Sequence, residues 1–229
     1  MGVTAIIFRR SINLSKTYLI IGVLMGAMAI GMSALGLVIP PSSEMPMDQQ
    51  TFFSIYFIGM ASMTAVLMAT PVLLLFVYDK NNGVLEYMLS IGMTQSSLFR
   101  SYLQAALTLV GIILVAEVVG NAALTLIIGG SAALLPSIAI LTTLLGISAV
   151  AFTTVLMMAF SSLQKQRVGA NQPLGIGLGV LLILPSFFLP ALLPEMAVAI
   201  VLANAAIVAL LSLAAYLLAG RLIDRKSVV

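Results

Sequence analysis

Long, nearly uninterrupted apolar runs constrain this chain more than any other feature of its sequence. Inside a bilayer every backbone N–H and C=O must be bonded within the protein, so only helices and closed barrels cross it. The runs are continuous rather than alternating, as helices require and barrel strands do not. They occupy about 17–39, 51–77, 101–128, 136–160, 173–189 and 196–219. The sequence therefore predicts an all-α integral membrane protein with six transmembrane helices.

Composition and loop lengths support one membrane domain over residues 1–229. The chain is 62% hydrophobic and only 7% charged, whereas soluble domains carry about 25% charged residues. Residues 3–14 mix apolar and basic side chains and are predicted to form an interfacial helix before the first span. A signal peptide and a disordered basic tail are the alternatives. The run at 17–39 is longer than the roughly 7–15 residues of a signal core.

Prolines modify two of the predicted spans. Pro71 lies inside the second run, where a proline kinks a membrane helix more readily than it ends one. Pro185, Pro190 and Pro194 interrupt the end of the fifth run. This segment is predicted to be a kinked helix end or a short hairpin that re-enters the membrane.

The basic residues predict the orientation of the chain. With six spans, all ten fall in segments on one side, whereas the loops on the other side carry only acids, Glu44, Asp48 and Glu195. The basic residues are Arg9, Arg10, Lys16, Lys80, Arg100, Lys165, Arg167, Arg221, Arg225 and Lys226. The positive-inside rule then places both termini in the cytoplasm of a multi-pass cell-membrane protein. It also explains the basic pI without nucleic acid as a partner.

The sequence offers no catalytic constellation. It has no Cys and no His, which removes thiolate nucleophiles, the commonest metal ligand and the usual proton shuttle. The spans contain no Ser–Lys or paired-Asp arrangement, and no Walker motif is present. We therefore expect a protein that is not itself an enzyme and holds no metal.

Two features inside the spans are candidates for function or packing. Glu117 is the only acid within a span, and Asn121 follows one turn later. Such an acid is expected to line a substrate path, bind a cation or form a hydrogen bond across a helix interface. Gly22 and Gly26 form a G-x-x-x-G pattern, which favours close helix packing within or between protomers.

The loop at 79–98 is the longest polar interruption between apolar runs. Within it, Val84, Leu85, Met88 and Leu89 form one apolar stripe on a short helix. Turn residues at 81–83 precede this helix, Gly92 can end it, and Thr94 can cap the next one. A short amphipathic helix between spans either lies on the bilayer or docks into a groove of a soluble partner.

This loop carries a resemblance to a known family. Residues 83–90, GVLEYMLS, followed by Thr94 and Arg100, resemble the cytoplasmic loop of type-2 (ABC-2) transporter permeases. The family pattern has an acidic–basic pair, Gly-Thr-Leu-Glu, two residues, Leu-Ser/Thr-Pro and a later Lys. Asp79-Lys80 is similar to the charged pair. Val84 replaces the Thr, Gly92 lies near the expected Pro, and Arg100 replaces the Lys.

The resemblance implies a coupling helix that seats in a groove of a separate ATPase subunit. The coupling residues are then Gly83, Val84, Leu85, Glu86, Met88, Leu89 and Arg100. ATP and Mg would be bound by that ATPase, so this chain would need no cofactor of its own. The implied protein is an exporter permease that works in membrane lipid as a homodimer or heterodimer.

Two other functions stay open from the sequence. The first is an ion-coupled secondary transporter or channel organised around Glu117. The second is an inert membrane anchor or assembly factor.

Overall fold

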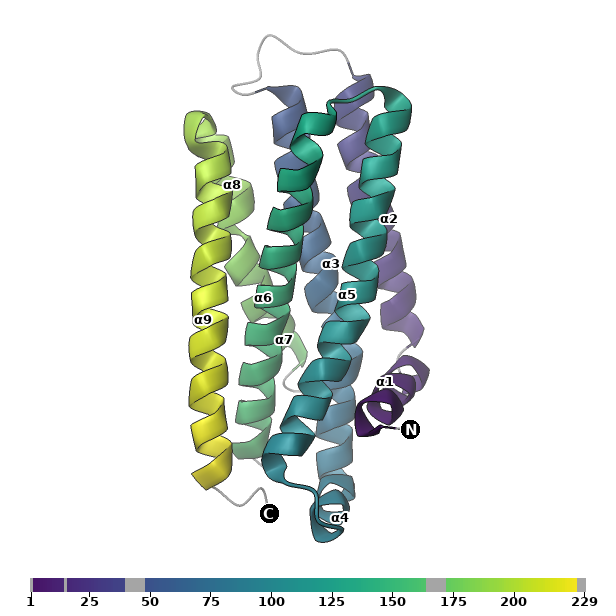
Figure 1. Cartoon of the computed structure of the whole chain (residues 1–229), viewed down its shortest axis with the longest axis vertical. Coiled ribbons are helices and arrows are strands. Elements are labelled where there is room, and N and C mark those ends of the chain that lie inside the picture. The colour runs from purple at the N-terminus through teal and green to yellow at the C-terminus, as the bar shows by residue number, and fades with distance from the viewer. Residues whose placement is uncertain (1, 15, 40–47, 164–171, 226–229) are drawn as a thin grey trace.

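The computed structural model of the chain describes residues 2–14, 16–39, 48–163 and 172–225. Every regular element in these ranges is a helix, and the long helices run side by side (Figure 1). The α-helices are α1 Val3–Leu14, α2 Lys16–Val38, α3 Gln49–Asn81, α4 Val84–Ser90, α5 Gln95–Ile128, α6 Leu135–Leu163, α7 Gln172–Ile183, α8 Pro185–Leu192 and α9 Ala197–Arg225. Two 3-10 turns, η1 Ala132–Leu134 and η2 Pro194–Met196, lead into α6 and α9.

Five of the described helices are long and apolar enough to cross a membrane: α2, α3, α5, the η1–α6 segment and the η2–α9 segment. They support the expected class, an all-α membrane protein. The fifth predicted span, about 173–189, is not one such helix. It is divided at Leu184 into α7 and α8, in agreement with the predicted interruption of this run by prolines. The described residues therefore contain five long helices and a broken pair, and the count of six spans stays a prediction.

Pro185 explains where the broken pair divides. It is the first residue of α8, a position that suits proline because its missing N–H has no intrahelical partner there. The break leaves the Leu182 carbonyl near a helix end, and Asn204 of α9 donates to it at 2.9 Å. The Asn204 amide also donates to Ser186 Oγ at 2.8 Å. This side chain therefore fastens the divided segment to α9. Pro71 has a milder effect than Pro185, because α3 continues through it without a break.

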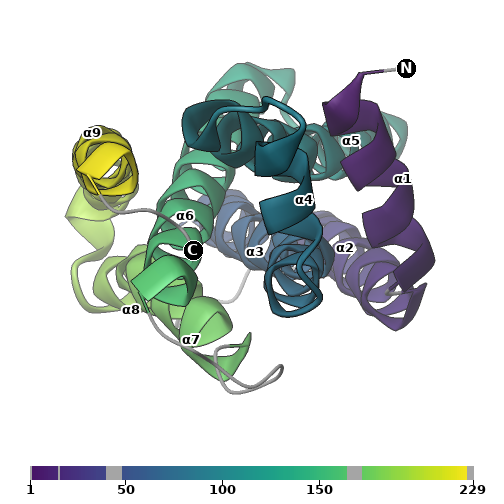
Figure 2. The same ribbon diagram turned by 90° about the horizontal axis from the view of Figure 1, so that it is seen from below.

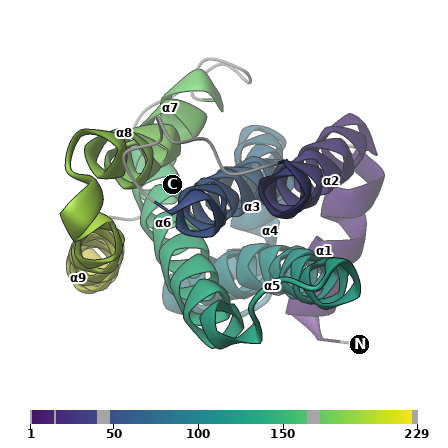
Figure 3. The ribbon, with the colours of Figure 1, turned by 90° about the horizontal axis from the view of Figure 1, so that it is seen from above.

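The long helix α3 is the centre of the bundle. It packs against α2, α5, α6 and α7, and the view from above shows it among these helices (Figure 3). Its buried side chains run from Gln49 to Asp79. On the outer side of α6 lies α9, which presents most of its side chains away from the bundle.

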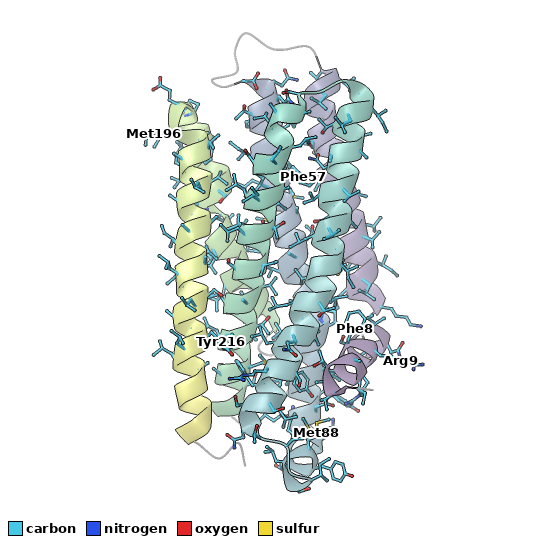
Figure 4. All side chains as sticks on the ribbon, viewed as in Figure 1. Phe8, Arg9, Phe57, Met88, Met196 and Tyr216 are labelled. Carbon is cyan, nitrogen blue, oxygen red and sulfur yellow. The ribbon has the colours of Figure 1, made fainter. Side chains whose placement is uncertain are left out.

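The two ends of the bundle differ in charge. Helices α1 and α4 and the carboxyl end of α9 lie at one end (Figures 1 and 2). Among the described side chains, Arg9, Arg10, Lys16, Lys80 and Arg100 belong to this end. Asp48 caps α3 at the opposite end, and η2, which contains Glu195 and the labelled Met196, lies at that end as well (Figure 4). Residues 44, 165, 167 and 226 lie outside the described residues.

Small residues bring α2 into close contact with its neighbours. The buried positions of α2 are Gly22, Gly26, Ala29, Ser33 and Gly36. A Cβ added to Gly22 would lie 1.8 Å from Cε of Met68 on α3, and one added to Gly26 would lie 2.4 Å from Oε1 of Glu117 on α5. The structure thus uses both glycines of the G-x-x-x-G pattern for contacts inside one protomer.

We expect Gly36→Ala to destabilise the protein, because the new Cβ would lie 2.6 Å from Cβ of Phe53, close to a backbone that cannot turn away. Overpacking of this kind costs about 1–3 kcal/mol. Gly31→Ala is the matched control on the same helix, since nothing lies within 4 Å of its Cβ position. Thermal unfolding in detergent should show a lower midpoint for Gly36→Ala only. Equal midpoints for the two variants would contradict the close contact.

Candidate functional site

The connection between α3 and α5 is a short helix bounded by turns on both sides. Gly83, with φ of +71°, starts α4, and Gly92, with φ of +96°, follows its end. These are left-handed conformations that favour glycine. Thr94 then caps α5 by accepting a hydrogen bond from the Ser97 amide at 3.2 Å. The local structure predicted for this loop is therefore present, and α4 projects beyond the end of the bundle (Figures 1 and 2).

The apolar stripe of α4 faces the protein itself. Leu85 is only 3% exposed and belongs to the core of the bundle. Val84, Met88 and Leu89 are half-buried. Leu85 is thus occupied by contacts within the chain in this structure, and its role of filling a partner's groove stays a prediction.

The outward face of α4 carries a different set of side chains. Tyr87 is 65% exposed and Ile91, directly after the helix, is 61% exposed. Glu86 and Ser90 are also exposed, and so is Arg100 on the first turns of α5. An aromatic and a branched aliphatic side chain beside a carboxylate form a mixed surface. Sequence reasoning missed Tyr87 and Ile91, because both fall outside the apolar stripe.

A buried carboxylate joins three helices next to α4. Asp79, near the end of α3, is 0% exposed and accepts two hydrogen bonds from the Arg10 guanidinium of α1, at 2.7 and 3.0 Å. The Tyr102 hydroxyl of α5 donates to the same carboxylate at 2.5 Å. The Tyr102 ring also packs edge-on against Phe76, with ring centroids 5.1 Å apart. We call Arg10, Asp79 and Tyr102 the Asp79 network.

Two further hydrogen bonds join helices at the same end of the bundle as the Asp79 network. Lys80, next to Asp79, donates to the Ser161 carbonyl of α6, and Thr4 of α1 donates to the Gln104 side chain of α5 at 3.3 Å. Ile7 and Ser11 of α1 are fully buried against the bundle. Helix α1 therefore lies across the end of α3 and α5 and is bound to both, while Arg9 points away from the bundle (Figure 4).

The predicted residues within the span form a separate location. Glu117 and Asn121 lie one turn apart on α5, and both are almost completely buried. Glu117 is 17 positions from Arg100, which is about 25 Å along a helix at 1.5 Å per residue. The structure thus brings Glu117 and Asn121 together between α5 and α2, but it keeps them far from α4.

A cavity of about 420 Å³ lies on the opposite side of α3. It is bounded by α3, by α8 and by Leu184, the residue between α7 and α8. Its walls are almost entirely apolar, and aromatic rings dominate them: Phe52, Tyr56, Phe187 and Phe188, with Met60 and Met63 beside them. Tyr56 and Phe187 pack edge-on with centroids 5.6 Å apart. Sequence patterns do not indicate this cavity, because it depends on how the broken pair α7–α8 packs on α3.

Comparisons with models of known protein families, with curated proteins and with solved structures find no match. The structure itself defines the class, a helical membrane protein with a short helix projecting from one end and an apolar cavity near the other. What the protein does must therefore be argued from these features.

We expect Arg10→Gln to lower the free energy of unfolding by about 2 kcal/mol. Removing one partner of a buried ion pair costs roughly 3–5 kcal/mol, and solvent at the partly exposed Arg10 reduces this value. The double variant Arg10→Gln with Asp79→Asn should recover part of the lost free energy of unfolding, because it leaves no unpaired charge buried. Arg9→Gln, one position away and exposed, is the control. Chemical unfolding in detergent measures all four proteins, and equal losses for Arg9→Gln and Arg10→Gln would contradict the role of the ion pair.

Proposed function

We propose that the chain is the transmembrane permease subunit of an ATP-driven ABC exporter, and that a separate ATPase subunit binds its α4 end. The observation that carries this proposal is the outward face of α4, held rigidly at the end of the bundle. ATP and Mg belong to the ATPase. The basic end of the bundle faces the cytoplasm of the cell membrane, as the positive-inside rule requires, so both termini are cytoplasmic there.

The orientation of α4 favours a protein partner over the bilayer surface. A helix that lies on lipid buries its apolar face in the membrane and places cations beside the headgroups. In α4 the apolar stripe turns toward its own bundle, and the exposed face carries Glu86 without any cation on the helix. An exposed Tyr beside an aliphatic residue suits the centre of a protein interface. The partner therefore contacts Tyr87 and Ile91, with Glu86 and Arg100 toward the rim.

The Asp79 network suits the transmission of force from such a partner. Helix α4 is joined to α3 and α5 by short turns, and Asp79 and Tyr102 tie those two helices together directly above it. A push on α4 therefore moves α3 and α5 as one unit. Because α3 also forms a wall of the apolar cavity, its movement would change that cavity. An apolar cargo fits these walls, and a second permease subunit, identical or related, would complete the transport path.

Glu117 favours a second candidate function, an ion-coupled transporter or channel. A carboxyl buried at mid-span is a common coupling site in such proteins. The two functions respond differently to Glu117→Gln. This change should abolish ion-coupled transport, but should leave ATP hydrolysis stimulated by the permease intact.

The first test is co-purification of the tagged chain from its native membranes in mild detergent with nucleotide present. We expect a Walker-motif ATPase with the wild type, and at least a tenfold lower recovery with Tyr87→Arg combined with Ile91→Asp. Loss of central interface residues costs about 2 kcal/mol or more, which is more than tenfold in affinity. Both residues are exposed, so the double variant should fold.

Arg9→Gln serves as the control for a general charge change at the same end. Absence of any ATPase from the wild-type preparation would contradict the transporter proposal. Undiminished recovery with the double variant would instead place the contact elsewhere than the outward face of α4.

A further inference from the structure

The Glu117 carboxyl is seated directly on the backbone of α2. A Cβ at Gly26 would lie 2.4 Å from Glu117 Oε1 and 3.1 Å from its Cδ, so a larger residue at position 26 would force the carboxyl to move. Glu117 is 4% exposed, and within the part of the chain that the structure describes neither of its oxygens has a hydrogen-bond partner. A buried carboxylate without a partner is costly by several kcal/mol, whereas a neutral carboxylic acid is tolerated far better.

No described cation lies near enough to stabilise a negative charge on Glu117. Residues 135–163, which form α6, contain no titratable side chain. Lys16 is ten positions from Gly26 along α2, or about 15 Å. The other described titratable groups on the helices packed against α5, and on α5 itself, are Arg9 and Arg10 on α1, Tyr18 on α2, Tyr56, Tyr78, Asp79 and Lys80 on α3, Arg100 and Tyr102 on α5, and Tyr216 on α9.

Most of these groups lie at the α4 end of the bundle. Asp79 is 15 positions from Thr64 and Tyr102 is 15 positions from Glu117, so each is about 22 Å away along its helix. Tyr56 is eight positions from Thr64, about 12 Å, and it contributes to the cavity on the other side of α3. The Asp79 carboxylate has already paired with Arg10. Glu117 is therefore electrostatically isolated.

A threonine hydroxyl beside Glu117 can accept a hydrogen bond from the protonated carboxyl. Thr64 of α3 lies beside the carboxyl, and its hydroxyl donates its single proton to the Met60 carbonyl at 3.0 Å. Thr64 Oγ can therefore accept a hydrogen bond but has no proton left to donate. A carboxylic acid can donate a hydrogen bond to Thr64 Oγ, whereas an ionised carboxylate can receive none from it.

We propose that Glu117 is a proton-binding site whose occupancy is coupled to the contact of α2 with α3 and α5. While α2 is packed, the carboxyl holds its proton. When α2 moves away, water enters, the O–H bond of the carboxylic acid breaks, and the proton passes to that water. The carboxylate that remains is hydrated, and α2 can return only after Glu117 takes up a proton again. This site does not depend on the proposed exporter function.

The coupling has a definite sign. The packed state binds one proton more than the separated state, so rising pH favours separation. The equilibrium constant for separation rises by up to tenfold per pH unit in the range where only the separated form is ionised. Acid conditions favour the packed state. Glu117→Gln keeps the size and neutrality of the protonated side chain, so it should remove this pH dependence without opening the contact.

Infrared difference spectra in lipid nanodiscs test whether Glu117 holds a proton. At neutral pH we expect a C=O stretching band of a protonated carboxylic acid in the wild type. The band should be absent from Glu117→Gln and present in Glu195→Gln, which removes an exposed acid as the matched control. Absence of the band from the wild type would overturn the proposal, and this result needs no variant to fold.

Thermal unfolding from mildly acidic to mildly alkaline pH tests the coupling to helix packing. The midpoint of the wild type and of Glu195→Gln should fall as pH rises, whereas that of Glu117→Gln should stay level over the same range. Should Glu117→Gln fail to fold, Glu117→Met replaces it as the neutral variant. Parallel pH profiles for the wild type and the neutral variant would overturn the coupling.

Discussion

The two-fold hydrogen bonding between Arg10 and the fully buried Asp79 is the interaction on which the α4 end of this structure depends. Asp79 would be an unpaired charge beside the membrane without Arg10, and Arg10 can reach it only because α1 lies across the ends of α3 and α5. Tyr102 uses a further lone pair of the same carboxylate. Asp79 therefore fixes the positions of α1, of the end of α3 and of the start of α5, and it lies next to α4.

The second buried acid is held in a different way. Asp79 and Glu117 both lie at contacts of α5, yet Asp79 has a cation and a hydroxyl donor, whereas Glu117 faces a glycine backbone and a hydroxyl whose proton is used elsewhere. A partnered carboxylate fastens helices together, because separation would expose a bare charge in a low dielectric. A neutral acid offers no such resistance once water reaches it. The contact of α5 with α3 at the α4 end is therefore firm, and the contact of α2 with this pair is the one that loss of a proton from Glu117 can release.

Sequence patterns predicted the helices well, because each depends on local features. The apolar runs, the turn before Val84, Gly92 and Thr94 specify where chain segments begin and end, and Pro185 divides the fifth run. What the sequence could not predict are relations between distant segments. Arg10 and Asp79 are 69 positions apart, and a single Arg in an amphipathic helix does not indicate its partner. The stripe on α4 likewise showed that one face is apolar, but an apolar face packs equally well on its own chain or on another.

The direction of α4 changes how a partner could act on this protein. A groove that took up Leu85 would have to pull it out of the core, at a cost of the order of a buried leucine, about 1.5–3 kcal/mol. A partner that binds Tyr87 and Ile91 leaves Leu85 in place, so α4 stays attached to the bundle while it is pushed. Because the Asp79 network joins α3 and α5 above α4, that push reaches both helices together. The contact along the small-residue face of α2, where Glu117 lies, would then be the one that opens when Glu117 loses its proton.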